Sequence, residues 1–263
     1  MSDLQRDWTG NVDRRQFIPD VIYIQREPLA DFTAVSREDE PELWEQQVSS
    51  DDPVITKLNP IVLPDGSSKL FWAASSSSAP AIMNQMISEL RLEPGLSVLE
   101  IGTGTGWNAA VMAHAGAIVT TVEVDAEIAQ RARAALDKAG YSHVFVIAGD
   151  GELGAPERAP FDRVIATAAV TNVPCSWVSQ VKDGGLIVFP YTGRYCSHGL
   201  AVITARAGIA VGEIRAEGRA GFMPLRNRDL SQAELQSIED ADRIGITVTK
   251  EGQELRVSLR DYA

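Results

Sequence analysis

A glycine-rich loop is the feature that most constrains how this chain folds. Its sequence, Gly102-Thr-Gly-Thr-Gly106, follows a short apolar run at 97–101 and precedes a segment rich in small residues at 107–115. The apolar run is typical of a strand and the small-residue segment of a helix. Glycines at such a junction let the backbone approach a ligand closely. The loop therefore predicts an α/β fold with a ligand site where the first core strand ends.

Strands and helices alternate around this loop. Apolar runs predict strands at 97–101, 118–122, 144–147, 161–167, 185–190, 200–204 and 209–214. Amphipathic or small-residue segments predict helices at 80–91, 107–115, 126–139 and 173–181. Such alternation gives a doubly wound sheet with helices on both faces. We therefore expect an α/β fold with a mainly parallel, seven-stranded, Rossmann-like sheet.

The two ends of the chain add to this core. Residues 1–70 look irregular, apart from a short helix near 36–44 and a hairpin that pairs 61–63 with 70–72 around Asp65-Gly66. The tail predicts a helix at 231–241, with Ser231 as its N-cap and Glu234 completing a capping box, then strands at 246–249 and 255–259. We expect residues 1–75 to cover a substrate cleft, 76–225 to form the core and 226–263 to be an extension.

Acidic residues follow the predicted strands where a nucleoside would bind. Glu123 comes 23 residues after Glu100, close to the spacing of about 20 expected for an acid that binds ribose hydroxyls. A carboxylate at position 100 would repel a pyrophosphate, and the loop lacks the Gly-x-Gly-x-x-Gly pattern, so NAD is disfavoured. A ligand with an ammonium group, such as S-adenosyl-L-methionine, fits better. Asp150 could accept from an adenine amino group. The alternatives are a solvated strand end for Glu123 and a turn aspartate for Asp150.

Composition excludes several other classes. The formal net charge of −12 disfavours nucleic acid as a partner. The two cysteines and three histidines are spaced unlike a metal site or a disulfide framework. Neither an apolar leader segment nor a membrane-spanning run is present in the sequence. We therefore expect a cytoplasmic protein with no metal, no membrane and no nucleic-acid partner.

A longer string of residues resembles one family of methyltransferases. It comprises Ser78-Ala-Pro80, Leu92 to Ala110 with the glycine loop, Gly149-Asp-Gly151, Ala159 to Ala169, Val173-Pro174, Gln180 to Pro190 and Phe222-Met-Pro-Leu225. Taken in order, these segments are similar to the protein L-isoaspartyl O-methyltransferases, which are class I methyltransferases that use S-adenosyl-L-methionine. The resemblance implies methyl transfer to a side-chain carboxylate of a peptide or protein.

The expected site follows from the resemblance and from the ends of the strands. By resemblance, Ser78 matches a serine that contacts both the acceptor carboxylate and the methyl donor; a helix N-cap is the other interpretation. Thr167, at the end of a strand, is expected to line the methyl-transfer pocket or else to cap the next turn. The expected cofactor-binding residues are Ser78, Glu100, Gly102, Thr103, Gly104, Gly106, Asn108, Glu123, Val124, Gly149, Asp150 and Gly151. Trp107 is expected to pack in the core.

Two acceptors are compatible with this chemistry. The additions at both ends, and the landmarks Phe17 to Asp20, Trp44 and Ser50 to Pro53, resemble the subgroup that modifies an aspartate in a ribosomally made peptide, whose ester then closes to aspartimide. That favours dedicated peptide modification. The alternatives are general repair of proteins that carry isoaspartate and a non-catalytic adaptor that binds S-adenosyl-L-methionine. A carboxylate is already ionised at neutral pH, so either transfer needs no general base.

Overall fold

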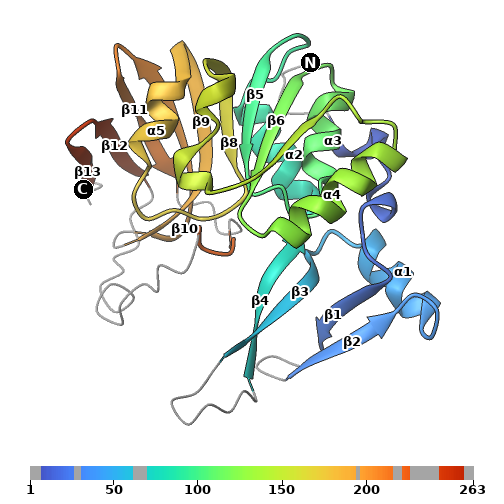
Figure 1. The fold of residues 1–263 in the computed structure, drawn as a ribbon. Helices are drawn as coiled ribbons and strands as arrows, with labels where there is room; N and C mark the ends of the chain where they lie inside the picture. Colours follow the sequence, from blue (N-terminus) through green and yellow to red (C-terminus); the bar gives the residue numbers. More distant parts are fainter. Residues whose placement is uncertain are drawn as a thin grey trace.

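The computed structural model describes residues 7–26, 31–61, 70–193, 196–215, 221–225 and 243–257. Within them the chain forms a large mixed sheet flanked by helices and a smaller N-terminal sheet (Figure 1). The large sheet contains β5 Ser97–Ile101, β6 Ile118–Glu123, β7 Phe145–Ala148, β8 Phe161–Ala166, β9 Val181–Gly193, β10 Cys196–Arg206, β11 Ile209–Arg215, β12 Arg243–Thr249 and β13 Gly252–Val257. The helices beside it are α2 Pro80–Glu89, α3 Trp107–His114, α4 Ala126–Lys138 and α5 Cys175–Gln180.

The large sheet combines a parallel half with an antiparallel half. Its order is β13-β12-β11-β10-β9-β8-β5-β6-β7, in which the strands from β9 to β7 pair in parallel and those from β9 to β13 antiparallel. The doubly wound, Rossmann-like arrangement is thus confirmed. The seven strands expected in the core are present as β5 to β11. With the two strands expected in the tail, β12 and β13, the described sheet has nine strands and is mixed. The two tail strands join it because β12 pairs along β11 and β13 along β12.

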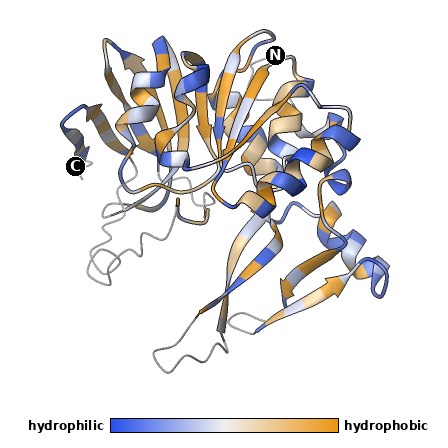
Figure 2. Cartoon of the chain, in the orientation of Figure 1, coloured by the Kyte–Doolittle hydropathy of each residue, from blue (hydrophilic) through white to orange (hydrophobic). Residues whose placement is uncertain are grey.

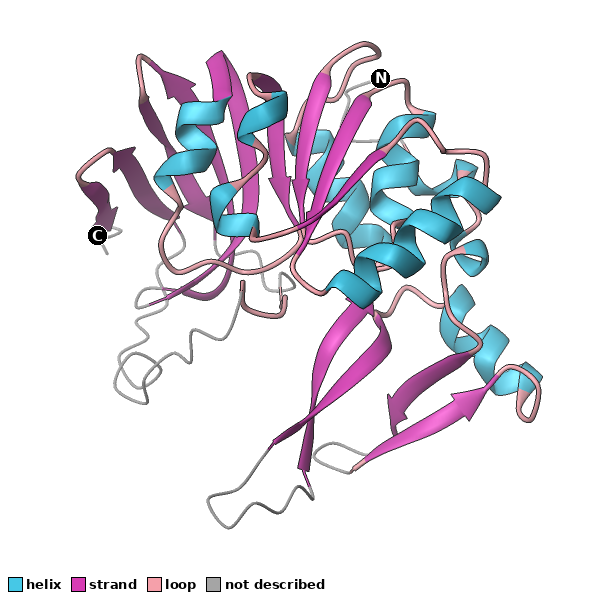
Figure 3. Ribbon diagram, in the orientation of Figure 1, coloured by secondary structure: helices cyan, strands magenta, loops and turns pink. Residues whose placement is uncertain are grey.

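Helices cover both faces of the parallel half. Neighbouring strand residues alternate between two apolar clusters: Val98 packs with α2 and α3, whereas Leu99 packs with Trp177 of α5. This alternation is what a strand buried on both faces requires. Figures 1 and 3 show α5 apart from α2, α3 and α4, and Figure 2 shows hydrophobic residues concentrated along the strands between them. The fold thereby leaves the carboxyl ends of the parallel strands open to a ligand.

The N-terminal region is an ordered sheet, so the expectation of irregular structure was wrong. Its strands β1 Val21–Gln25, β2 Phe32–Ser36, β3 Val54–Ile61 and β4 Leu70–Ser77 form an antiparallel sheet of order β2-β1-β3-β4. A small core holds it together, built on Ile22, Val35 and Trp44. The alternation along β1 and β2 is too weak to predict strands, because only one residue of each, Ile22 and Val35, is fully buried.

Other local expectations have mixed outcomes. The helix expected near 36–44 is α1 Pro41–Ser49, which starts with proline in its first turn. A hairpin of β3 and β4 is present, with Ile61 opposite Leu70, but Phe71 and Trp72 lie opposite Pro60 and Asn59 instead of residues 61–63. Residues 62 and 63 lie outside the described residues. The hairpin bend at Asp65-Gly66 and the predicted helix at 231–241 also lie outside the described residues. In the part of the chain that is described, every helix is too short or too polar to cross a membrane.

Candidate active site

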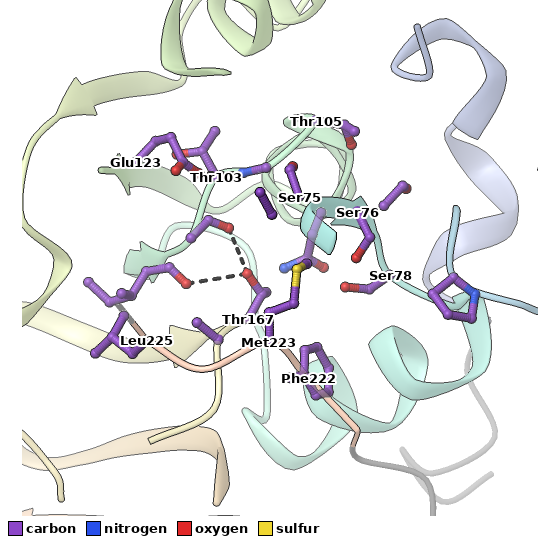
Figure 4. A pocket seen from close by; sticks show the side chains of 18 of the residues that line it. Ser75, Ser76, Ser78, Thr103, Thr105, Glu123, Thr167, Phe222, Met223 and Leu225 are labelled. Carbon is purple, nitrogen blue, oxygen red and sulfur yellow. Dashed lines mark hydrogen bonds between the residues drawn. The ribbon is translucent and has the colours of Figure 1, made fainter. Parts of the chain in front are cut away.

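A cavity of about 340 Å³ opens where the parallel strands end. The carboxyl ends of β5, β6 and β8 form one side, as expected for an open α/β sheet. The end of β4 from the N-terminal sheet and residues 221–225 form the other (Figure 4). Two parts of the chain far apart in sequence thus meet over the sheet edge. The site joins a strand-end ligand pocket to residues of the N-terminal sheet.

The glycine loop lies against this cavity with all three glycines at positive φ. A Cβ on Gly102 would lie 2.7 Å from the Thr167 hydroxyl oxygen, and one on Gly104 would lie 3.3 Å from the Ser76 carbonyl. The third glycine, Gly106, instead packs its α-carbon side against Leu136 of α4 and does not line the cavity. The first two glycines therefore let the loop approach the cavity and the third allows close helix packing.

Glu100 lies beneath the cavity rather than in its lining. It is fully buried and accepts hydrogen bonds from Asn108 Nδ2 and Thr121 Oγ1, each at 2.7 Å. Burial raises the pKa of the Glu100 carboxyl to about 7, against the opposing effect of these two hydrogen bonds. Thr103 Oγ1 lies 2.7 Å from Thr121 Oγ1 and extends the network. Glu100 thus supports the loop and α3 from below.

Glu123 ends β6 in the cavity lining. Its side chain is buried, so the interpretation as a solvated strand end was wrong. One carboxylate oxygen accepts from Gly104 N at 2.9 Å and the other from Asp125 N at 3.2 Å. Burial raises the pKa of the Glu123 carboxyl. The neighbouring Val124 also lines the cavity and is partly exposed there. This acid is positioned beside the glycine loop, as the spacing from Glu100 suggested.

Asn108, in the first turn of α3, has one amide atom without a partner. Its Nδ2 donates to Glu100, while its buried Oδ1 has no hydrogen-bond partner among the described residues. The residue lines the cavity and is 7% exposed. An unpaired buried acceptor costs roughly 1–3 kcal/mol, so a donor from a bound ligand would be favourable here. The neighbouring Trp107 is buried, as expected, and also contributes to the lining.

Ser78 follows β4 and lines the cavity, but it does not cap α2. The N-cap position is occupied by Ala79, and no N-cap side chain accepts a hydrogen bond there. Asp51 takes over this function, since its Oδ1 accepts from Ala81 N at 2.7 Å. The interpretation of Ser78 as the helix N-cap was therefore wrong, because the N-cap is the next residue, Ala79. Figure 4 shows Ser76, Ser78 and Thr167 around the same space.

The remaining predicted residues lie at the ends of β7 and β8. Thr167 lines the cavity, and its hydroxyl donates back to the Gly102 carbonyl at 2.6 Å instead of capping a following turn. Asp150 also lines the cavity, and its carboxylate accepts from Glu152 N at 3.0 Å, so the turn-aspartate interpretation describes its geometry. Its neighbour Gly151 is in the lining and Gly149 is not.

The segment 221–225 contributes residues to which the sequence assigned no role. Two backbone hydrogen bonds with Ala169 hold it, from Ala169 N to Met223 O and from Leu225 N to Ala169 O, at 2.8 and 2.7 Å. Phe222, Met223 and Leu225 thereby form one wall of the cavity. The motif Phe222-Met-Pro-Leu225 was visible in the sequence, but no pattern predicted its pairing across more than 50 residues. In the residues described, no cluster of three potential metal ligands occurs.

Two solved structures with a similar architecture are named as isoaspartate methyltransferases. One named protein-L-isoaspartate O-methyltransferase aligns with 97% of this chain and 84% of its own, at a TM-score of 0.62 and 20% identity. A second comes from Plasmodium falciparum and is described as a putative protein of the same kind in complex with S-adenosyl-L-homocysteine. It aligns with 85% of this chain and 92% of its own, at a TM-score of 0.56 and 16% identity. These likenesses define the fold as the Rossmann-like methyltransferase fold.

The family follows from the sequence match. The model of the protein-L-isoaspartate(D-aspartate) O-methyltransferase family matches residues 65–229, more than half of the chain, and the chain belongs to this family. Relatives named protein-L-isoaspartate O-methyltransferase include those of Hyperthermus butylicus, 42% identical over half of this chain, and Thermococcus onnurineus, 40% identical over 56% of it. The matches span 59% and 68% of those two relatives' lengths. A third such relative, from Gloeobacter violaceus, is 40% identical over 50% of this chain and 64% of its own length.

Proposed function

We propose that this protein is an S-adenosyl-L-methionine-dependent carboxyl O-methyltransferase that acts on the free carboxylate of isoaspartyl residues in proteins. The observation that carries the proposal is that the glycine loop, Glu123 and Ser78 all line the same cavity, in a chain of this family. One half of the cavity suits a nucleoside and the other half an acceptor. Both halves are needed for a methyl transfer between two bound molecules.

The cofactor half is favourable to a cation with hydrogen-bond donors. Two buried acids, Glu100 and Glu123, lie in or below it, and Asn108 Oδ1 needs a donor. In the proposed complex, Glu123 would hold the ribose hydroxyls, Asn108 would hold the amino-acid part, and Asp150 with Val124 would border the base. When bound, S-adenosyl-L-methionine supplies a methyl group activated by its sulfonium. The description of the Plasmodium falciparum structure, which names the demethylated form as its ligand, supports this assignment.

The acceptor half orients a carboxylate without a base. A carboxylate oxygen of the acceptor attacks the methyl carbon, the carbon–sulfur bond breaks, and its electron pair stays on sulfur, so no proton moves. The Ser78 hydroxyl donates to the acceptor carboxylate, and the apolar wall of Phe222 and Met223 excludes water. Orientation of this kind contributes roughly 7–11 kcal/mol to such reactions. The next backbone nitrogen then displaces methanol from the ester and closes a succinimide.

General repair is supported better than modification of one dedicated peptide. The three relatives compared above are all named for isoaspartate. The additions at both ends had favoured the dedicated role, yet an isoaspartate methyltransferase structure aligns with 97% of the chain, so those additions do not separate the two. The proposed partners are therefore proteins or peptides that carry isoaspartate.

The test is base-labile methylation of aged protein. Protein incubated for weeks accumulates isoaspartate, and a carboxyl methyl ester releases methanol in mild base. We expect labelled methyl transfer to aged protein, release of the label as methanol, and a large loss of transfer in Ser78→Ala. Binding of S-adenosyl-L-homocysteine without any transfer would favour the adaptor alternative.

A further inference from the structure

Arg14 is a buried and extensively hydrogen-bonded side chain beside the cavity. It is 6% exposed, and its guanidinium donates to five carbonyl oxygens and one hydroxyl. Nη1 reaches two carbonyls and Nη2 three, and Nε reaches the Ser77 hydroxyl at 3.1 Å. All five N–H groups of the guanidinium have an acceptor, so Arg14 has no donor left for a bound molecule.

These contacts join separate parts of the chain at one point. On one side are the carbonyls of Val48, Ser50 and Asp52, at and after the end of α1. On the other are the carbonyls of Ser77 and Ser78, at 2.8 and 2.9 Å, where β4 enters the cavity wall. The guanidinium also lies 5.4 Å from the centre of the Trp107 ring, at the start of α3. Arg14 thus links the N-terminal sheet to the cavity lining.

The charge of Arg14 is held by neutral acceptors. Its hydrogen-bond partners in the described residues are carbonyls and a hydroxyl, and burial lowers its pKa to about 10, with Asp51 and Asp52 acting in the opposite direction. Lysine has three donors around a single nitrogen and cannot reproduce a fork that spans two chain segments. The site therefore requires the shape of the guanidinium and not only its charge.

From this geometry we infer that Arg14 is a positioning residue for the acceptor carboxylate, acting through Ser78. By holding the carbonyls of the two peptide bonds that flank Ser78, it fixes the backbone from which the Ser78 hydroxyl enters the cavity. The inference rests on the proposed function, in which Ser78 contacts the acceptor. Arg14 itself touches neither acceptor nor cofactor, so its loss affects the orientation of the acceptor more than the affinity for the cofactor.

A double-mutant cycle on the full chain separates this role from a merely structural one. Arg14→Lys, Ser78→Ala and the double variant are compared for kcat and KM with an isoaspartyl peptide and for the Kd of S-adenosyl-L-homocysteine. We expect Arg14→Lys to lower kcat/KM at least tenfold, the double variant to be no worse than Ser78→Ala alone, and the Kd to change less than threefold. Arg163→Lys is the matched control, because Arg163 Nε donates to the Leu90 carbonyl at 2.7 Å away from the cavity.

Three results would overturn the inference. The first is that Arg14→Lys lowers kcat/KM by the same factor in the Ser78→Ala background as in the wild type. The second is that Arg14→Lys is as active as the Arg163→Lys control. The third is that the wild-type chain binds S-adenosyl-L-homocysteine but methylates no isoaspartyl peptide. That result refutes the proposed function, and the inference about Arg14 falls with it. If Arg14→Lys does not fold, Ser77→Ala removes the Nε contact and leaves the five carbonyl contacts of Arg14 in place. It must then lower kcat/KM in the wild type and have no further effect in the Ser78→Ala background.

Discussion

The Thr167 hydroxyl donates a hydrogen bond to the Gly102 carbonyl oxygen across 2.6 Å. The two residues directly follow the neighbouring parallel strands β8 and β5, and both line the cavity. A second bond, from Thr167 N to the Ile101 carbonyl at 2.8 Å, reinforces the link. The floor of the site is therefore built from backbone groups that a side chain locks in place. This arrangement makes the first glycine of the loop sensitive to any added atom.

The first prediction concerns that glycine. Gly102→Ala places a Cβ 2.7 Å from Thr167 Oγ1 at a φ of +91°, so it combines a steric clash with backbone strain. Gly95→Ala is the matched control, since Gly95 has a similar φ of +85° and nothing within 4 Å. We expect Gly95→Ala to cost about 1 kcal/mol and Gly102→Ala about 1–3 kcal/mol more, in urea unfolding. Equal losses would show that the contact with Thr167 relaxes without cost.

The second prediction concerns the buried carboxyl of Glu100. Its pKa of about 7 lies above the value near 4.3 expected in the unfolded chain, so the folded state binds the proton more tightly. The contribution of Glu100 to the free energy of unfolding is then largest below about pH 4 and falls as the pH rises to about 7, by an amount on the order of 3 kcal/mol. The raised pKa of Glu123 changes the free energy of unfolding with pH in the same direction. In Glu100→Gln we expect this decline to shrink, measured as the free energy of unfolding at pH 5 and pH 8. Parallel pH profiles for the two proteins would contradict it.

The third prediction concerns the orphan acceptor of Asn108. If its Oδ1 accepts a hydrogen bond from the amino group of the cofactor, Asn108→Ala should weaken the binding of S-adenosyl-L-homocysteine by about tenfold or more. That is the effect of losing one hydrogen bond to a charged group. Adenosine, which lacks the amino-acid part, serves as the internal control and should bind both proteins alike. Calorimetry with the two ligands measures both effects. A matching loss for adenosine would mean that the substitution disturbs the whole pocket.

The fourth prediction concerns the ion pair between the two sheets. Lys57 Nζ of β3 lies 2.6 Å from Asp125 Oδ2, and the same carboxylate caps α4 through its other oxygen. The hydrogen bond from Lys57 is the largest cause of the lowered pKa of Asp125. Because both side chains are partly exposed, we expect Lys57→Met to cost only about 0.5–1 kcal/mol at low salt and less in 1 M NaCl. The stabilising effect should also fade as the pH falls through the lowered pKa of Asp125. A loss that persists at high salt would indicate packing instead.

The sequence predicted the parallel half of the fold well, because β5, β6 and β8 are mostly buried apolar runs and α4 has a clear apolar face. Strands β5, β6 and β8 and helices α3 and α4 lie within two residues of their predicted ends. The N-terminal sheet was missed because few of its residues are buried, so its strands lack a clear pattern. Within the site, the loop and Glu123 followed from local spacing. The wall at 221–225 and the contacts of Arg14 depend on pairing between distant segments, which spacing cannot reveal.

Methyl transfer to two matched peptides tests the central claim most directly. The peptides share one sequence and differ only in whether the central residue is isoaspartate or normal aspartate, and the methyl donor is labelled S-adenosyl-L-methionine. Our account predicts base-labile label on the isoaspartyl peptide and none above background on the aspartyl peptide. If neither peptide is labelled although the protein still binds S-adenosyl-L-homocysteine, the result would contradict general isoaspartyl repair.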